Sequence, residues 1–297
     1  MPDTFTAVDL SRLPAPQVVE TLSFEAILAD MLADLRSRDP AFTATVESDP
    51  AYKILQVAAY RELLLRARIN DAAKAVLIAY ATGADLENLG ALLGVTRLLL
   101  SAGDPETGTP AVYESDTDLR RRITLAPEGF SVAGPEGAYI FHTLSADPDV
   151  LDASVASPTP GQVVVTVLSR IGAGTASAPL LAAVTARLNA ADIRPLTDEV
   201  IVQSATVTNF TITASIATFA GPDAAVVLAE SRNRLDAYLA ENHRLGRDVT
   251  RSAIFAALHA GGVQGVTLTA PAADIVIARS AVANCTAITL TPAGVAE

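Results

Sequence analysis

The sequence has no tryptophan, one cysteine and three histidines among 297 residues. The single cysteine, Cys285, permits no internal disulfide and no cysteine-based zinc site, which fits a reducing compartment. The histidines, His142, His243 and His259, have no second histidine or cysteine three or four residues away, which is the local spacing of many metal sites. We therefore expect packing or surface roles for all three histidines, and no bound metal or cofactor.

Sequence signatures of catalysis are also missing. The chain has no Gly-x-Ser-x-Gly nucleophile elbow, and Cys285 has no base near it in the sequence, so we interpret it as a small buried residue. Asp147, Asp149 and Asp152 lack the glycine bend and distal glutamate of a calcium loop, which favours a solvated turn. The sequence thus predicts no catalytic residue and a protein that is not an enzyme.

One glycine-rich turn leaves an alternative open. Gly172-Ala-Gly174-Thr-Ala-Ser177 follows an expected strand and opens a helix, with Asp192 twenty residues after the first glycine. A dinucleotide fingerprint has this order, but Ser177 replaces its third glycine and Asp192 precedes the next strand instead of ending it. A flexible turn accounts for these residues, and a cytoplasmic nucleotide-binding enzyme using Gly172–Ser177 is the alternative function.

Basic charge is scarce, because 33 acidic and 21 basic residues give a net charge of −12. Such a chain repels a phosphate backbone or an anionic lipid surface. The only basic run, Arg120-Arg121-Arg122, is flanked by acidic residues, and Asp118 has the spacing to pair with Arg122. The longest charge-free stretch, 200–222, alternates polar and apolar residues, which predicts two strands and no membrane span. We expect neither nucleic acid nor a membrane as partner.

Apolar residues make up 50% of the chain, enough for a sizeable core. Ser23 is a favourable N-cap for a helix whose apolar residues recur at helical spacing over 24–35. Asp49 and Pro50 open a second helix that we expect to run over 50–82, about 48 Å at 1.5 Å per residue. A short third helix, 86–93, follows Asp85. The N-terminal third is therefore predicted to be helical.

The long helix carries apolar residues around much of its circumference, which is typical of a helix in a bundle or against another chain. Its length exceeds that of an average helix several-fold. We therefore predict an interface formed by Ile54, Val57, Tyr60, Leu64, Ile69 and Val76.

The rest of the chain mixes helices and strands. Residues 101–116 read as a solvated loop and a domain boundary. After it we expect these elements: helices 117–126, 135–146, 177–191, 223–241 and 249–260, and strands 150–156, 162–168, 196–206, 208–219, 263–269 and 283–290. The turn 157–161 makes either a hairpin or a tight crossover, and strand–helix–strand runs suggest a weak internal repeat.

These elements predict an α+β fold class, with an N-terminal helical region containing one long helix, followed by two small α+β domains in the C-terminal half. The predicted domains are 1–100 (helical bundle region), 101–206 (middle α+β domain) and 207–297 (C-terminal α+β domain).

Several segments, in this order, resemble the baseplate J-like family of contractile phage tails. They include Glu47-Ser-Asp-Pro-Ala-Tyr-Lys-Ile-Leu55 and Ser115-Asp-Thr-Asp-Leu-Arg-Arg-Arg-Ile123. The other matching segments are 59–62, Asn70, 79–86, 133–135, Tyr139, 157–161, 194–200 and 262–263. Gln56 departs from the pattern, since many relatives are expected to have an acidic residue there. The resemblance spans nearly the whole chain.

The resemblance implies a structural component of the baseplate wedge that forms the inner baseplate ring and is needed for tail assembly. In such assemblies two copies of a J-like protein grip a third wedge protein through an N-terminal helical bundle, and the C-terminal domains pair between wedges. The implied partners are a second copy of this chain, other wedge proteins including a P2 I-like tail protein, and baseplate hub or sheath-proximal proteins. The implied location is the virion tail baseplate, assembled in the bacterial host cytoplasm.

Overall fold

The computed structural model describes residues 10, 13, 14, 16, 18–40, 46–221 and 223–295. Two compact units are present, which we call the helical unit (8–97 and 115–123) and the sheet unit (98–114 and 124–297). The described residues form eight helices and eight strands in small sheets, with the helical region first in the chain. The predicted α+β fold class is confirmed.

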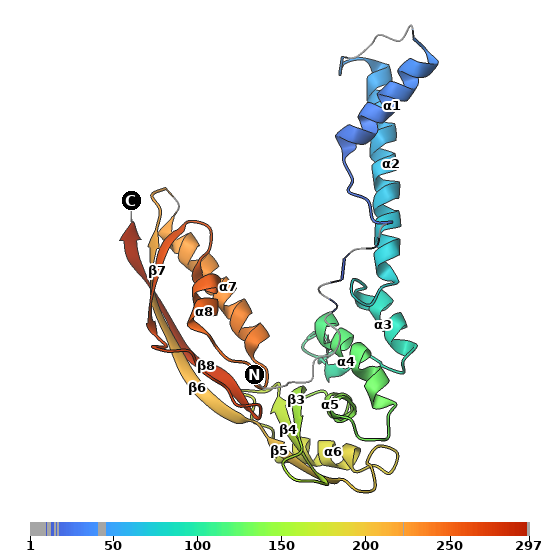
Figure 1. Cartoon of the computed structure of the whole chain (residues 1–297). Coiled ribbons are helices and arrows are strands. Elements are labelled where there is room, and N and C mark those ends of the chain that lie inside the picture. Colours follow the sequence, from blue (N-terminus) through green and yellow to red (C-terminus); the bar gives the residue numbers. More distant parts are fainter. Residues whose placement is uncertain are drawn as a thin grey trace. The chain divides into compact units, whose positions relative to one another are not determined.

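The helical unit is built on two helices, α1 (Phe24–Arg38) and α2 (Pro50–Ala75), which lie against each other (Figure 1). Both predicted N-caps are confirmed, because the Ser23 hydroxyl accepts a hydrogen bond from the Ala26 amide and the Asp49 carboxylate accepts one from the Ala51 amide. Three buried residues form the centre of the contact: Ile27, Leu28 and Ala59.

Helix α2 ends at Ala75, so the prediction of a helix over 50–82 is wrong at its C-terminal end. The following residues form turns, and the Arg120 guanidinium binds the carbonyl oxygens of Ile78 (2.7 Å) and Ala81 (2.6 Å). These bonds satisfy backbone acceptors that a longer helix would have used itself. Arg120 thus stabilises the turns that follow α2 in place of a further helical turn.

Helix α3 (Gly83–Ala91) also starts earlier than the predicted 86–93. Its N-cap, Thr82, makes no side-chain capping bond, and the Asp116 carboxylate accepts a hydrogen bond from the Gly83 amide at 3.1 Å instead. Asp85, the predicted cap, lies within the first turn. Asp116 belongs to the next helix, α4 (Asp116–Gly129), so this cap comes from another element.

The predicted loop 101–116 contains part of a short antiparallel hairpin. Strand β1 (Leu99–Ser101) pairs with β2 (Val112–Tyr113), and an isolated bridge joins Asp104 to Thr109 between them. Gly103, with φ near 68°, leaves no room for a side chain against the Thr109 carbonyl. This segment does contain a turn, but the sequence pattern did not predict the backbone pairing between β1 and β2.

A three-stranded sheet of order β3-β4-β5 follows. Its strands are β3 (Val150–Ala156), β4 (Gln162–Ser169) and β5 (Glu199–Ser204). The first two form an antiparallel hairpin, which decides between the two predicted connections, while β5 runs parallel to β4 after helix α6 (Ala178–Leu188). Helices α5 (Glu136–Leu144) and α6 pack on β3 and β5 respectively and share one core with the sheet.

The second sheet has the order β7-β6-β8. It consists of β6 (Thr206–Thr218), β7 (Val263–Ala270) and β8 (Ala281–Val295), and α7 (Ala224–Asn242) and α8 (Arg251–Leu258) lie along one face (Figure 1). Strand β8 exceeds the predicted 283–290 because β6 pairs with it in parallel along nearly its whole length. The internal repeat is imperfect, since β6 and β7 are antiparallel whereas β4 and β5 are parallel.

Within the sheet unit, polar and apolar contacts join the two sheets. The buried Asp152 carboxylate on β3 accepts a hydrogen bond from the Leu245 amide at 2.9 Å. The neighbouring Arg244 guanidinium donates to the Leu151 carbonyl oxygen at 2.6 Å. Around these bonds lies a cluster of four buried apolar residues: Leu168, Ala205, Leu245 and Val282. The contact combines buried hydrogen bonds with apolar packing, as in a domain core.

Asp152→Ala should lower the free energy of unfolding by about 1–3 kcal/mol, because the Leu245 amide loses its acceptor in a buried place. Urea denaturation of the full chain measures the change. Asp152→Asn is the control, since it keeps an acceptor oxygen and should cost less. An alanine variant as stable as the parent would show that the bond contributes nothing.

Candidate interaction surface

Helix α2 has two sides with different surroundings. One side packs on α1 through Ala59, and Asn70 on that side holds the chain before α1 in place. The Asn70 side-chain amide donates to the Glu20 carbonyl oxygen (2.9 Å) and accepts from the Glu20 amide (3.0 Å). No described residue covers the other side, because its large apolar side chains are exposed.

The six residues predicted from the sequence as an interface are all exposed, from 43% for Leu64 to 68% for Ile54 and Val76. Leu65, which the prediction missed, is 67% exposed; its position four residues before Ile69 was the available signal. Val76 is the C-cap residue, just beyond the helix. The remaining residues define the open face of α2: Ile54, Val57, Tyr60, Leu64, Leu65 and Ile69.

A shallow groove of about 870 Å³ lies at the N-terminal end of the open face. Its apolar lining comes from Phe24 of α1 and from Val57, Tyr60 and Leu64 of α2. The charged residues of the lining, Lys53 and Arg61, are both cationic. Exposed apolar patches of this kind mark interaction sites on soluble proteins. The arrangement suits a helix laid along α2, with apolar side chains in the groove.

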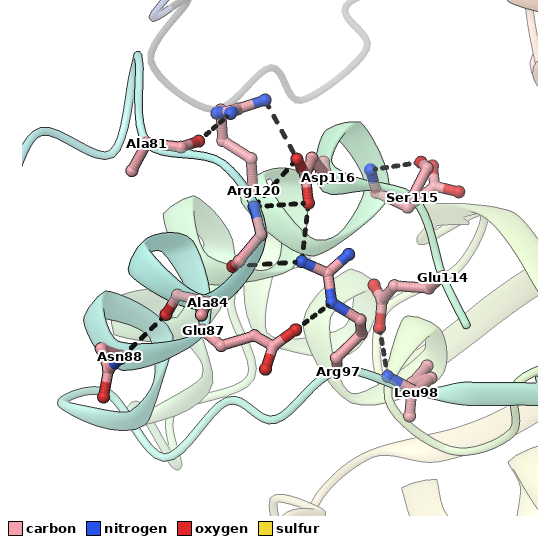
Figure 2. Close-up of polar contacts among 12 residues, drawn as sticks. Ala81, Ala84, Glu87, Asn88, Arg97, Leu98, Glu114, Ser115, Asp116 and Arg120 are labelled. Atoms are coloured by element: carbon pink, nitrogen blue, oxygen red, sulfur yellow. Dashed lines mark hydrogen bonds and ion pairs between the residues drawn. The ribbon is translucent and has the colours of Figure 1, made fainter. Parts of the chain in front are cut away.

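A polar cluster centred on Arg97 joins α3, α4 and the turn that follows α2 (Figure 2). The Arg97 guanidinium binds Glu87 and Asp116, each at 2.6 Å, and Arg120 binds the Ala81 carbonyl oxygen beside it. The hydrogen bond from Arg97 lowers the pKa of the Asp116 carboxyl group. Because Arg97 is mostly buried, these ion pairs hold a fixed geometry between α3 and α4. The cluster thereby ties the turn at Ala81 to α3 and α4.

The basic run is used inside the helical unit. Arg120 binds the carbonyl groups beyond α2, and Arg122, which is 6% exposed, donates to the Thr96 carbonyl oxygen at 3.0 Å. These two arginines serve folding, so they do not form an exposed basic patch of the kind that binds phosphate.

The three histidines lie in separate places. His142 is buried on α5, and burial, with Arg187 nearby, lowers its pKa. His243 and His259 are the C-cap residues of α7 and α8, each directly after the last helical residue, so the helix predicted over 249–260 ends before His259. Cys285 is half-buried on β8, and burial raises the pKa of its thiol. Among the residues that the structure describes, no three or more His, Cys, Asp or Glu side chains gather as a metal site would require.

The glycine-rich turn packs closely against its own domain. Gly174 has φ near 101°, and a Cβ there would lie 2.4 Å from the Leu168 side chain. The Ser177 hydroxyl caps α6 by accepting from the Leu180 amide, so this helix N-terminus is already satisfied internally. Asp192 is exposed in the loop after the helix. The geometry favours the structural turn over a phosphate cradle.

The aspartate cluster is also structural. The Asp149 carboxylate accepts hydrogen bonds from the Ser169 hydroxyl (2.9 Å) and the Arg170 amide (3.1 Å). Asp147 accepts one from the Asp149 amide.

In the described part of the chain, no helix combines the length and the apolar composition needed to cross a bilayer.

Comparison with known proteins gives the class to which the chain belongs. The chain matches the baseplate J-like N-terminal domain over 47–104, the central domain over 131–204 and the C-terminal domain over 210–291. Together with the relative described next, these matches show that the chain belongs to the baseplate J-like family. The resemblance seen in the sequence is confirmed.

The relative is Baseplate protein J of Escherichia phage P2, which is 49% identical over 288 residues, covering 94% of this chain and 95% of that protein. A chain in the cryo-EM structure of the anti-feeding prophage baseplate, 6-fold symmetrised, also aligns. That alignment has a TM-score of 0.41 and 15% identity, and covers 61% of this chain and 44% of the other. Family membership supports a structural role in the baseplate of a phage tail.

Asp116→Ala should destabilise the helical unit by about 1 kcal/mol, because α3 loses its cap and Arg97 loses an ion-pair partner. Thermal unfolding followed by circular dichroism measures it. Asp85→Ala is the matched control, since the structure gives this residue no capping bond to the Gly83 amide. An equal loss of stability in the Asp116→Ala and Asp85→Ala variants would contradict the assignment of Asp116 as the cap of α3.

The contribution of Asp116 should also depend on pH. Its pKa is lower in the folded chain than the ordinary value of about 3.9, so it stabilises the fold above that value. The stability is lost as pH falls through the folded pKa, when the carboxylate is protonated. The difference in unfolding free energy between the parent and Asp116→Ala should therefore shrink between pH 6 and about pH 3. A constant difference would rule out the charged form as the cause.

Proposed function

We propose that this chain is a component of the baseplate wedge of a contractile phage tail or tail-like injection particle. In this role it forms the inner baseplate ring and is needed for tail assembly. The observation that carries the proposal is the open face of α2. Exposing a row of apolar side chains to water is unfavourable in free energy, and a partner chain that buries them removes this cost. The identity to Baseplate protein J supports it.

In the proposed arrangement, the open face of α2 and Val76 contact other chains in a helical bundle. The bundle contains a second copy of this chain and a P2 I-like tail protein. The C-terminal domain contacts neighbouring wedges and, with them, hub or sheath-proximal proteins. The division into domains 1–100, 101–206 and 207–297 stays a prediction within this proposal, and the assembly takes place in the cytoplasm of the bacterial host.

A scaffold of this kind needs no turnover chemistry. The aspartates and the glycine-rich turn that the sequence offered as candidate sites make internal hydrogen bonds in the described chain. The alternative, a nucleotide-binding enzyme using Gly172–Ser177, predicts that an adenine dinucleotide raises the melting temperature of the full chain. The scaffold proposal expects no such shift.

Leu64→Asp should prevent incorporation into baseplates, because it places an unpaired charge in the proposed bundle at a cost of several kcal/mol. The free chain should keep its stability, since Leu64 is 43% exposed. Complementation of a knockout, with electron microscopy of the particles produced, measures completed baseplates. Thermal unfolding of the purified variant checks its folding.

Leu92→Asp is the matched control for this experiment. Leu92 is 81% exposed, lies in the same unit and receives the same substitution, but it is not on the open face of α2. Normal tails are expected from this variant. Completed tails from Leu64→Asp, in numbers equal to the control, would refute the role of the open face.

A further inference from the structure

The open face of α2 has a charge pattern as well as an apolar one. Residues spaced alternately three and four apart form its centre, which is the spacing of a coiled-coil seam. We call these residues the seam: Ile54, Val57, Arg61, Leu64, Arg68 and Asp71. Three of these positions are apolar and three are charged. A charged residue in a seam costs stability and sets which partner and which register are accepted.

The cations outnumber the anions on this face. Arg61 and Arg68 are seven residues apart and exposed, and Lys53 lies beside them in the groove lining, against a single carboxylate, Asp71. No ion pair or hydrogen bond within the described residues engages the guanidinium of Arg61 or of Arg68. A local excess of positive charge is unusual in a chain of net charge −12.

We propose that the occupant of the open face is an acidic amphipathic helix of a different protein. Its apolar side chains fill the groove at Val57 and Leu64, and its carboxylates, two helical turns apart, pair with Arg61 and Arg68. This inference rests on the proposed function and specifies the chemistry of the partner in the bundle. Paired in this way, the two arginines fix the register of the foreign helix along α2.

A second copy of α2 fits this face less well. A parallel self-pair sets Arg61 against Arg61 and Arg68 against Arg68. An antiparallel self-pair can bring Arg61 to Asp71 of the other copy. Even so, the two copies together contribute six cations (Lys53, Arg61 and Arg68 from each) and only two carboxylates (Asp71 from each). The α1 helix of a second copy has acidic residues, yet its large apolar side chains, such as Ile27 and Leu28, are already packed on its own α2.

Lys53 allows a direct test, because Lys53 and Lys74 are the only lysines in the sequence. Intact particles are treated with a zero-length carbodiimide cross-linker, which joins an amine to a carboxylate in contact with it. The expected result is an intermolecular product that links Lys53 to an aspartate or glutamate in a helical segment of another protein. Mass spectrometry identifies that residue.

Three results overturn the proposal. One is a product between Lys53 and a second copy of this chain. Another is acetylation of Lys53 as fast in particles as in the free chain, which shows an uncovered face. The last is protection of Lys53 without any carboxylate product, which shows a partner that is not acidic there.

Charge variants give the second test. Arg61→Glu combined with Arg68→Glu should lower incorporation into particles at least about tenfold, because carboxylates would then face carboxylates. Arg61→Lys with Arg68→Lys keeps the charge and should restore most of the incorporation. Arg187→Glu with Arg194→Glu is the matched control, since both arginines are exposed, seven apart and outside the helical unit.

The outcomes separate this inference from the proposed function. Incorporation of the Arg61→Glu and Arg68→Glu chain at the control level, while Leu64→Asp is excluded, leaves the bundle in place and refutes the acidic helix. Incorporation of both variants refutes the open face as an interface. Circular dichroism of each free chain must match the parent, as expected for side chains without partners in the described structure.

Discussion

Helix α2 has apolar side chains on two opposite sides, and among the described residues α1 covers only one of them. Helix α1 takes the side around Ala59, where burial is complete. The side with Ile54, Val57 and Leu64 stays exposed, although burying each such side chain is worth about 1.5–3 kcal/mol. No described residue covers this face, and the proposed role in an assembly depends on its being covered by another chain.

Polar contacts also fix the elements within each unit. Arg120 binds the backbone carbonyl groups of the turns after α2, and Arg97 joins Glu87 of α3 to Asp116 of α4 (Figure 2). In the sheet unit, Asp152 joins the two sheets through a buried hydrogen bond. Assemblies that transmit force need parts that repack as rigid bodies, and buried charged hydrogen bonds of this kind oppose gradual deformation.

Local signals in the sequence were reliable where the cause of structure is local. Ser23 and Asp49 cap the helices they were predicted to cap, and period-two alternation placed β3 within its observed bounds. The predictions were wrong where the cause is distant in the chain. Residues 78–81 form turns whose carbonyl groups bind the distant Arg120, and α3 is capped by Asp116 instead of Asp85. Strand β8 is longer because β6 pairs with it.

The sequence by itself determined that the chain folds as α+β and that it carries no local catalytic or metal motif. It also determined that one long helix has apolar residues around much of its circumference, more than a single packed side needs. Periodicity and caps report these properties because each depends on residues a few positions apart. Only the tertiary structure decided which side of that helix is open. Exposure depends on where α1 packs, and amphipathic spacing is the same for a covered face and a free one. The exposure of the open face, with Leu65 and with Arg61 and Arg68 that pair with no described residue, follows from where α1 packs.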